Sequence, residues 1–264
     1  MTGDLDLLPT LSGEDMPGDY ACALLSGEDV EPPVFSPAYF RLLLVYNRRG
    51  FTALRRYSSS DTTTGWGPEA KADVRISNGW LRNMVRGATA LRGVVYWPLA
   101  WHVLGVRLDG ASATMEQYML SYGCPQPIPV NRSGNLTIGV SPEGRLCLVI
   151  MVMLGRFLGV DAQSFQNDDQ DISVGRWERQ ERSRVIMLDQ FKLERPEAMT
   201  SRWYCEKSGV LFFTLGQGCS IRGTFALNLE TKELNKIADR ESWTSFCGYE
   251  MGRDTYLRSL ILPP

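Results

Sequence analysis

The chain has 264 residues, of which 44% are apolar and 22% charged, and its net charge is −2 at pH 7. This apolar content is enough for a folded core, and the near-neutral balance excludes the strong basic field of a nucleic-acid-binding domain. No apolar run approaches the ~18 residues of a membrane span, and the acidic start lacks the features of a signal peptide. We therefore expect a cytoplasmic or nuclear protein that binds neither nucleic acid nor membranes.

The N-terminal part of the chain differs in composition from the rest. Residues 1–40 hold eight acidic side chains and no Lys or Arg, and residues 1–18 also carry scattered Gly and Pro. This composition predicts a flexible acidic leader over residues 1–18, followed by one domain over residues 19–264. Residues 20–25 form a short apolar run that is compatible with a strand.

From residue 40 onward, short apolar runs alternate with turn residues, which predicts β-strands at residues 40–46 and 51–57. A similar unit then recurs, in which a turn glycine leads an apolar strand, a loop and two further strands. Its leading glycines are Gly93, Gly144 and Gly209. We expect these glycines to adopt positive φ in tight hairpin turns. Residues 178–189 are compatible with either a helix or a strand.

The recurring units lie at residues 40–80, 84–125, 135–195 and 200–240, with two strands of a fifth at residues 248–260. A period near ~50 residues is typical of kelch-type propeller blades. We therefore predict an all-β fold, a partial or open kelch-like β-propeller of about four to five blades. Aromatic residues at strand ends, such as Trp97 and Phe213, are expected to fill the space between blades. Pairing of the strand at Tyr20 with residues 248–260 would close the ring.

The residues that carry chemistry do not form a recognisable catalytic pattern. The single histidine, His102, lies between Trp101 and Val103 with no identifiable nucleophile nearby, so we interpret it as a strand residue beside a hairpin. The cysteines are too far apart in sequence for a CxxC pair. The glycines near residue 218 and the acidic run at 167–171 depart from the spacings of phosphate-binding and calcium-binding loops. We expect no enzyme activity, cofactor or metal.

Candidate partner-binding residues are Trp and Arg side chains that the sequence places near turns. Trp80 has Asn78, Gly79 and Arg82 as neighbours, and Trp101 is followed by His102. Exposed Trp and Arg are the residue types that dominate interface hot spots. We therefore select Trp80, Arg82, Trp101 and His102 as a candidate surface for a protein partner.

Several segments together resemble the C-terminal, F-box-associated region of grass F-box proteins, and the resemblance runs from about residue 20 to residue 260. They are Phe40–Asn47, Tyr57–Asp61, Arg92–Leu99, Leu104–Asp109, Glu206–Thr214 and Gly248–Met251. The resemblance implies a propeller-like domain that recognises the substrate of a plant ubiquitin ligase. In that family a separate N-terminal F-box docks on the Skp-type linker of a cullin complex.

The chain departs from the family pattern at its N-terminus. Leu8-Pro9 matches the start of an F-box, but Gly13, Pro17 and Gly18 interrupt the amphipathic helices that an F-box requires. We therefore expect a protein-interaction domain without direct Skp-type docking, a truncated or competing form of its relatives. Two alternatives stay open: an enzyme with its site in the propeller channel, and a truncated product of low stability whose end blades are uncovered.

Overall fold

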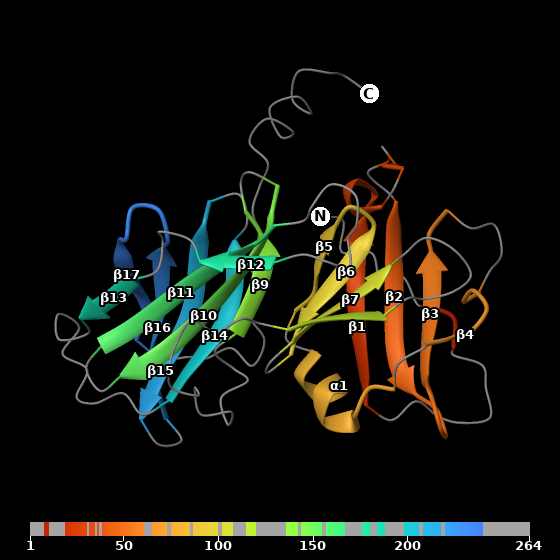
Figure 1. The fold of residues 1–264 in the computed structure, drawn as a ribbon, viewed down its shortest axis with the longest axis horizontal. Coiled ribbons are helices and arrows are strands. Elements are labelled where there is room, and N and C mark those ends of the chain that lie inside the picture. Colours follow the sequence, from red (N-terminus) through yellow and green to blue (C-terminus); the bar gives the residue numbers. More distant parts are fainter. Residues whose placement is uncertain are drawn as a thin grey trace. The chain divides into compact units, whose positions relative to one another are not determined.

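The computed structural model describes residues 8–10, 19–30, 32–34, 36, 39–60, 65–72, 75–84, 87–99, 102–107, 115–119, 136–141, 144–154, 157–166, 176–179, 184–187, 198–205, 208–217 and 220–239. The chain divides into two compact units, Met1–Leu120 and Ser121–Pro264 (Figure 1). The described residues form four antiparallel sheets, two in each unit, so the all-β prediction is confirmed.

The first unit contains two four-stranded sheets, each built from consecutive strands. The first sheet has the order β1-β2-β3-β4 and the second has the order β5-β6-β7-β8. A short 3-10 helix (Gly27–Asp29) follows β1, and helix α1 (Asn78–Met84) connects the two sheets. The strand bounds are β1 (Tyr20–Ser26), β2 (Phe40–Asn47), β3 (Thr52–Ser58), β4 (Ala70–Lys71), β5 (Thr89–Leu91), β6 (Val94–Pro98), β7 (His102–Arg107) and β8 (Met115–Met119).

The second unit also contains two sheets of consecutive strands. In the third sheet the order is β12-β11-β10-β9, and β13 pairs with the part of β11 that β12 leaves uncovered. The fourth sheet has the order β14-β15-β16-β17. The bounds are β9 (Leu136–Val140), β10 (Leu146–Leu154), β11 (Phe157–Gln166), β12 (Arg176–Arg179), β13 (Arg184–Met187), β14 (Ala198–Cys205), β15 (Val210–Gln217), β16 (Ser220–Asn228) and β17 (Leu234–Ala238).

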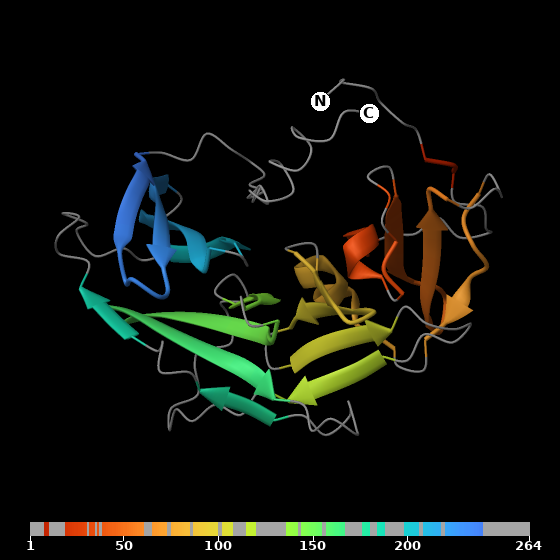
Figure 2. The ribbon, with the colours of Figure 1, turned by 90° about the horizontal axis from the view of Figure 1, so that it is seen from above.

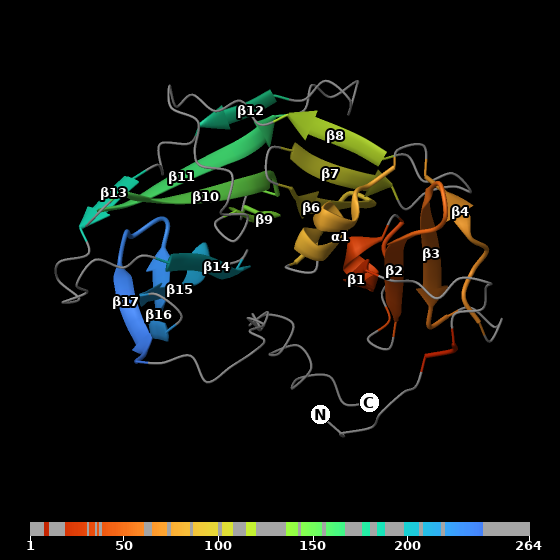
Figure 3. The ribbon, with the colours of Figure 1, turned by 90° about the horizontal axis from the view of Figure 1, so that it is seen from below.

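Within each unit the two sheets bury apolar faces against each other. In the first unit Trp97 of β6 is fully buried in a core that also contains Leu43 of β2 and Leu81 of α1, and Figure 3 shows α1 beside β1. In the second unit Phe213 of β15 shares a core with Val149 of β10, where the fourth sheet (blue) lies over the third (green) in Figure 2. The expected placement of Trp97 and Phe213 between sheets is confirmed. This pairwise burial removes apolar surface that a single twisted sheet leaves in water.

The predicted turn glycines have the expected backbone conformation. The φ angles of Gly93, Gly144 and Gly209 are 72°, 72° and 63°. Each lies in the left-handed region that residues with a Cβ rarely adopt, and each precedes the apolar strand that the sequence pattern identified. The recurring glycine therefore marks a real hairpin turn at each of these places.

Three predictions about the elements need correction or completion. The first sheet begins at Tyr20 and not near residue 40, because β1 pairs along its whole length with β2. Residues 176–179 and 184–187 form strands, so the strand alternative is confirmed where the structure describes that region. The predicted strands at residues 248–260, and their pairing with the strand at Tyr20, lie outside the described residues.

Helix α1 was not predicted, because Asn78 and Gly79 are poor helix formers. It begins where Ser77 provides an N-terminal cap, with the Ser77 hydroxyl oxygen 3.3 Å from the Trp80 backbone nitrogen that donates to it. The Asn47 amide nitrogen donates to the Ile76 carbonyl at 2.9 Å and to the Asn78 side-chain oxygen at 2.6 Å. Tertiary hydrogen bonds from β2 therefore fix a helix that local propensity does not predict.

Candidate functional site

The first sheet has two faces of different character. Side chains alternate along β1, so Ala21, Ala23 and Leu25 lie in the core while Tyr20 and Leu24 point to the opposite face. On that opposite face the exposed fractions of Tyr20 and Leu24 are 51% and 72%. We call this side of the first sheet the outer face, and it carries an exposed apolar row along a strand at the edge of the sheet.

The strands β2 and β3 continue the outer face inward from the edge. Leu44 stands opposite Arg55, and Tyr46 stands opposite Ala53, so these pairs share one face of the sheet. Leu44, Tyr46 and Ala53 form a small buried cluster against which Phe51 and Trp66 pack. The outer face is therefore apolar at its centre and is partly covered by the loop that carries Trp66.

A row of aromatic rings crosses this face. The ring centroids of Phe40 and Tyr57 are 5.8 Å apart, and those of Tyr57 and Trp66 are also 5.8 Å apart. The tilts between ring planes are 31° and 58°, within the range of favourable offset and edge contacts. We call Phe40, Tyr57 and Trp66 the aromatic row.

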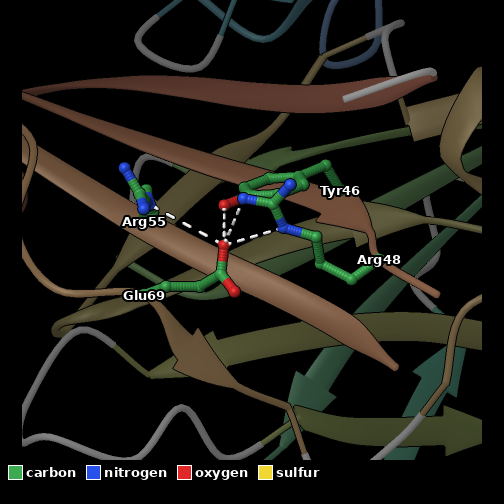
Figure 4. Close-up of polar contacts among 4 residues, drawn as sticks. All are labelled: Tyr46, Arg48, Arg55 and Glu69. Carbon is green, nitrogen blue, oxygen red and sulfur yellow. Dashed lines mark hydrogen bonds and ion pairs between the residues drawn. The ribbon is translucent and has the colours of Figure 1, made fainter. Parts of the chain in front are cut away.

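At one side of the buried cluster, three polar side chains meet at Glu69, as Figure 4 shows. The Oε2 atom of Glu69 accepts hydrogen bonds from Arg48 Nε at 3.0 Å and Arg48 Nη2 at 2.9 Å, and another from the Tyr46 hydroxyl. Arg55 Nε lies 3.8 Å from the same oxygen, and the Arg48 guanidinium stands 5.2 Å from the centroid of the Tyr46 ring. We call Tyr46, Arg48, Arg55 and Glu69 the Glu69 cluster.

The protonation states of the Glu69 cluster follow from these contacts. Burial raises the pKa of Tyr46, and its hydrogen bond to the Glu69 carboxylate raises it further. Burial also raises the pKa of Glu69, but the hydrogen bonds from Tyr46 and Arg48 and the charges of Arg48 and Arg55 outweigh it and lower the pKa overall. Near pH 7 Glu69 is ionised and Tyr46 is protonated, so neither is suited to proton transfer at that pH.

The cluster retains one donor that is not used. Arg55 Nε is buried and has no hydrogen-bond partner among the described residues, since 3.8 Å to Glu69 is an ion-pair distance only. The Arg55 side chain as a whole is 13% exposed. A buried donor without a hydrogen-bond partner costs free energy, and because this Nε atom is closed to solvent, Arg55 acts on the outer face through its charge.

The sequence-selected residues are located as follows. Arg82 lies on α1 with a side chain 71% exposed, and its Nε donates to the Asp19 carboxylate at 2.8 Å. Trp80, on the same helix, is partly buried against the core of the first unit and not exposed as expected. His102 begins β7 opposite Met119, and Trp101 lies outside the described residues. The structure thus brings Trp80 and Arg82 onto one short helix.

No member of the Glu69 cluster is predicted from the sequence. The alternation of β2 and β3 contains part of the signal, because it puts Tyr46 and Arg55 on one face once the hairpin register is known. Glu69 reaches that face from a loop, and strand periodicity does not predict where a loop residue lies.

Among the described residues, no group of His, Cys, Asp and Glu has the arrangement of a metal site, and no helix has the length and apolar character of a membrane span. Comparison of the sequence with protein-family models matches no family, and comparison with curated proteins finds no significant relative.

Proposed function

We propose that this chain is a protein-interaction domain of the substrate-recognition type, similar to the F-box-associated region of plant F-box proteins. We further propose that its sheets are blades of a partial, kelch-like propeller. Support for this comes from the sheets of consecutive antiparallel strands and from their pairwise packing within each unit. In the family, ligase docking belongs to the F-box, and the proposal concerns target recognition alone.

The observation that carries the proposal is the composition of the outer face of the first sheet. Tyr20 and Leu24 are exposed on an edge strand, next to the aromatic row and the Glu69 cluster. Protein interfaces combine an apolar centre with Tyr, Trp and Arg side chains, and these dominate binding energy. An exposed apolar row beside rigid aromatic and arginine side chains therefore suits a protein partner.

We also propose that the Glu69 cluster serves binding and not catalysis. The Glu69 cluster lies on this face, and its pKa shifts keep Glu69 ionised and Tyr46 protonated at neutral pH. General acid–base catalysis favours groups that titrate near the working pH. A pre-formed set of charges is instead the arrangement that orients a bound partner.

The test compares partner capture by the intact chain and by two matched variants. Leu24→Asp places a charge on the outer face, and Ile237→Asp is the control because Ile237 is also exposed, at 52%, on the edge strand β17. Each immobilised protein is incubated with cereal seedling extract, and the strongest specific ligand is then expressed and its Kd measured.

We expect the Kd to rise at least about tenfold for Leu24→Asp and to stay unchanged for Ile237→Asp. Equal binding by both variants would contradict the proposed surface. Direct binding of a recombinant Skp-type protein to the chain would contradict a role restricted to target recognition.

A further inference from the structure

We propose that the aromatic row binds an extended, proline-containing peptide segment, and that Leu8–Thr10 of this chain occupies that place in cis. The inference rests on the proposed protein-interaction function and names the partner chemistry of the same face. Its starting observation is a hydrogen bond between residues far apart in sequence. The Trp66 indole nitrogen donates to the Pro9 carbonyl oxygen at 2.7 Å, in a partly buried position.

The backbone around Pro9 suits an extended ligand. Proline fixes its own φ and restricts the residue before it to extended conformations, so Leu8-Pro9 loses little conformational entropy when it binds. Residues 8–10 are neither helix nor strand, and Pro9 is less exposed than Leu8 and Thr10 on either side. Pro9 is thus the residue of this segment that is most shielded from solvent.

The aromatic row, which includes the Trp66 that contacts Pro9, resembles in composition the grooves that bind proline-containing peptides. Such grooves are lined by aromatic rings, against which flat proline rings pack, while a side-chain donor fixes the register of the peptide carbonyls. Here Phe40, Tyr57 and Trp66 supply a continuous line of rings, and the Trp66 indole N–H supplies the donor. Phe40 and Tyr57 lie on β2 and β3, so the sheet fixes their positions, and Trp66 packs against the buried cluster of Leu44, Tyr46 and Ala53.

Charge complements this reading. The Glu69 cluster borders the aromatic row and contains two arginines for one carboxylate, so it carries a net positive charge. The chain's own Leu8-Pro9 follows Asp4 and Asp6 within a stretch that has no Lys or Arg. The preferred ligand is therefore an extended segment with a proline and a nearby acidic residue.

The cis segment competes with a partner. β1 begins at Tyr20, eleven residues after Pro9, and a covalent connection this short in sequence gives the cis segment an effective concentration on the order of millimolar. A partner peptide must displace Leu8–Thr10 before it contacts Trp66. The leader thus sets a threshold for binding.

The experiment follows the Trp66 indole signal by ¹⁵N NMR in the full chain, with Trp66→Phe assigning it among the seven tryptophans. The triple variant Leu8→Gly, Pro9→Gly, Thr10→Gly keeps the backbone carbonyl of residue 9 but removes the side chains and the restricted backbone that favour the bound state, so the segment should leave Trp66. Pro32→Ala is the control because Pro32 is exposed in another loop. A synthetic peptide of residues 4–14, and the same peptide with Pro9→Ala, are then titrated into each protein.

We expect the triple variant, but not Pro32→Ala, to shift the Trp66 signal and to speed exchange of the indole proton with solvent. The peptide should restore the original signal in the triple variant and bind wild type at least about tenfold more weakly, because the cis segment competes. The Pro9→Ala peptide should bind the triple variant at least about fivefold more weakly than the unsubstituted peptide does. An unchanged Trp66 signal in the triple variant, or peptide binding that leaves Trp66 unmoved, would overturn the inference.

Failure of this inference is distinguishable from failure of the proposed function. If Leu24→Asp binds the partner more weakly but no peptide shifts the Trp66 signal, the peptide site is contradicted and the wider interaction surface is supported. A peptide that moves Trp66, with equal partner binding by Leu24→Asp and Ile237→Asp, supports the groove and contradicts the wider surface.

Discussion

The hydroxyl of Thr52 joins two parts of the first sheet by donating to the Asn47 side-chain oxygen at 2.8 Å and accepting from the Ile76 backbone nitrogen at 2.8 Å. Thr52 is fully buried, so its hydroxyl has no water to replace these partners. The bond to Ile76 fixes the chain just before α1, and the bond to Asn47 fixes the hairpin between β2 and β3. One side chain therefore couples the hairpin to the helix that bears Trp80 and Arg82.

We predict that Thr52→Val destabilises the first unit by about 1–3 kcal/mol, because it removes the partners of the partly buried Asn47 side-chain oxygen and of the buried Ile76 N–H. Thr52→Ser keeps the hydroxyl and should cost clearly less. Urea unfolding of the full chain, followed by tryptophan fluorescence, measures both. Equal losses for Val and Ser would show that packing and not the hydrogen bonds sets the cost.

A second prediction concerns acid stability. Because the pKa of Glu69 is lowered in the folded chain, its contribution is present above the ordinary carboxyl value of 4.5 and is lost as the pH falls through the folded value. Glu69→Gln should lower the free energy of unfolding by about 1–2 kcal/mol near pH 7, and this difference in stability from wild type should shrink below about pH 4.5. Urea unfolding from pH 7 to about pH 3 measures it, with exposed Glu233→Gln as the control. A difference that is constant with pH contradicts the ionised cluster.

For Tyr46 we predict a contribution to stability that falls as the pH rises in the alkaline range. Its pKa is raised above 10.0, so its contribution is complete below that value and is lost as the pH rises through the folded value. The difference in free energy of unfolding between wild type and Tyr46→Phe should therefore stay constant up to about pH 10 and decline at higher pH. Difference absorbance near 295 nm should show one tyrosine titrating late in wild type only. A Tyr46 that titrates with the exposed tyrosines would contradict its hydrogen bond to Glu69.

The turn glycines give a prediction that involves the backbone alone. Gly144 has a φ of +72°, and a Cβ added there would meet nothing within 4 Å. Gly144→Ala should lower the free energy of unfolding by about 1–2 kcal/mol, because alanine disfavours the left-handed conformation. Gly144→Asn should lower it less, because asparagine tolerates that conformation better. Gly65→Ala is the matched control, because Gly65 also has open space and lies outside the left-handed region. If thermal unfolding shows the same loss of stability for Gly65→Ala as for Gly144→Ala, this explanation is contradicted.

The sequence predicts the sheets well because local pattern and local turn chemistry agree there. Val94–Trp97 follows a glycine with positive φ, and the buried face of β6 lies where the apolar run requires it. The candidate site is predicted poorly because it is assembled from distant parts. Glu69 and Trp66 reach the outer face from a loop, and the contact between Trp66 and Pro9 spans 57 residues. Periodicity identifies faces, but it does not identify which loop covers them.

The most direct measurement of the central claim is hydrogen exchange of the full chain with and without the captured partner. If the outer face of the first sheet is the recognition surface, partner binding should slow exchange in β1 (Tyr20–Ser26) and in residues 65–71, and should leave β17 (Leu234–Ala238) unchanged. Protection that falls on β17 or on other described strands, with β1 and residues 65–71 unaltered, would contradict the account.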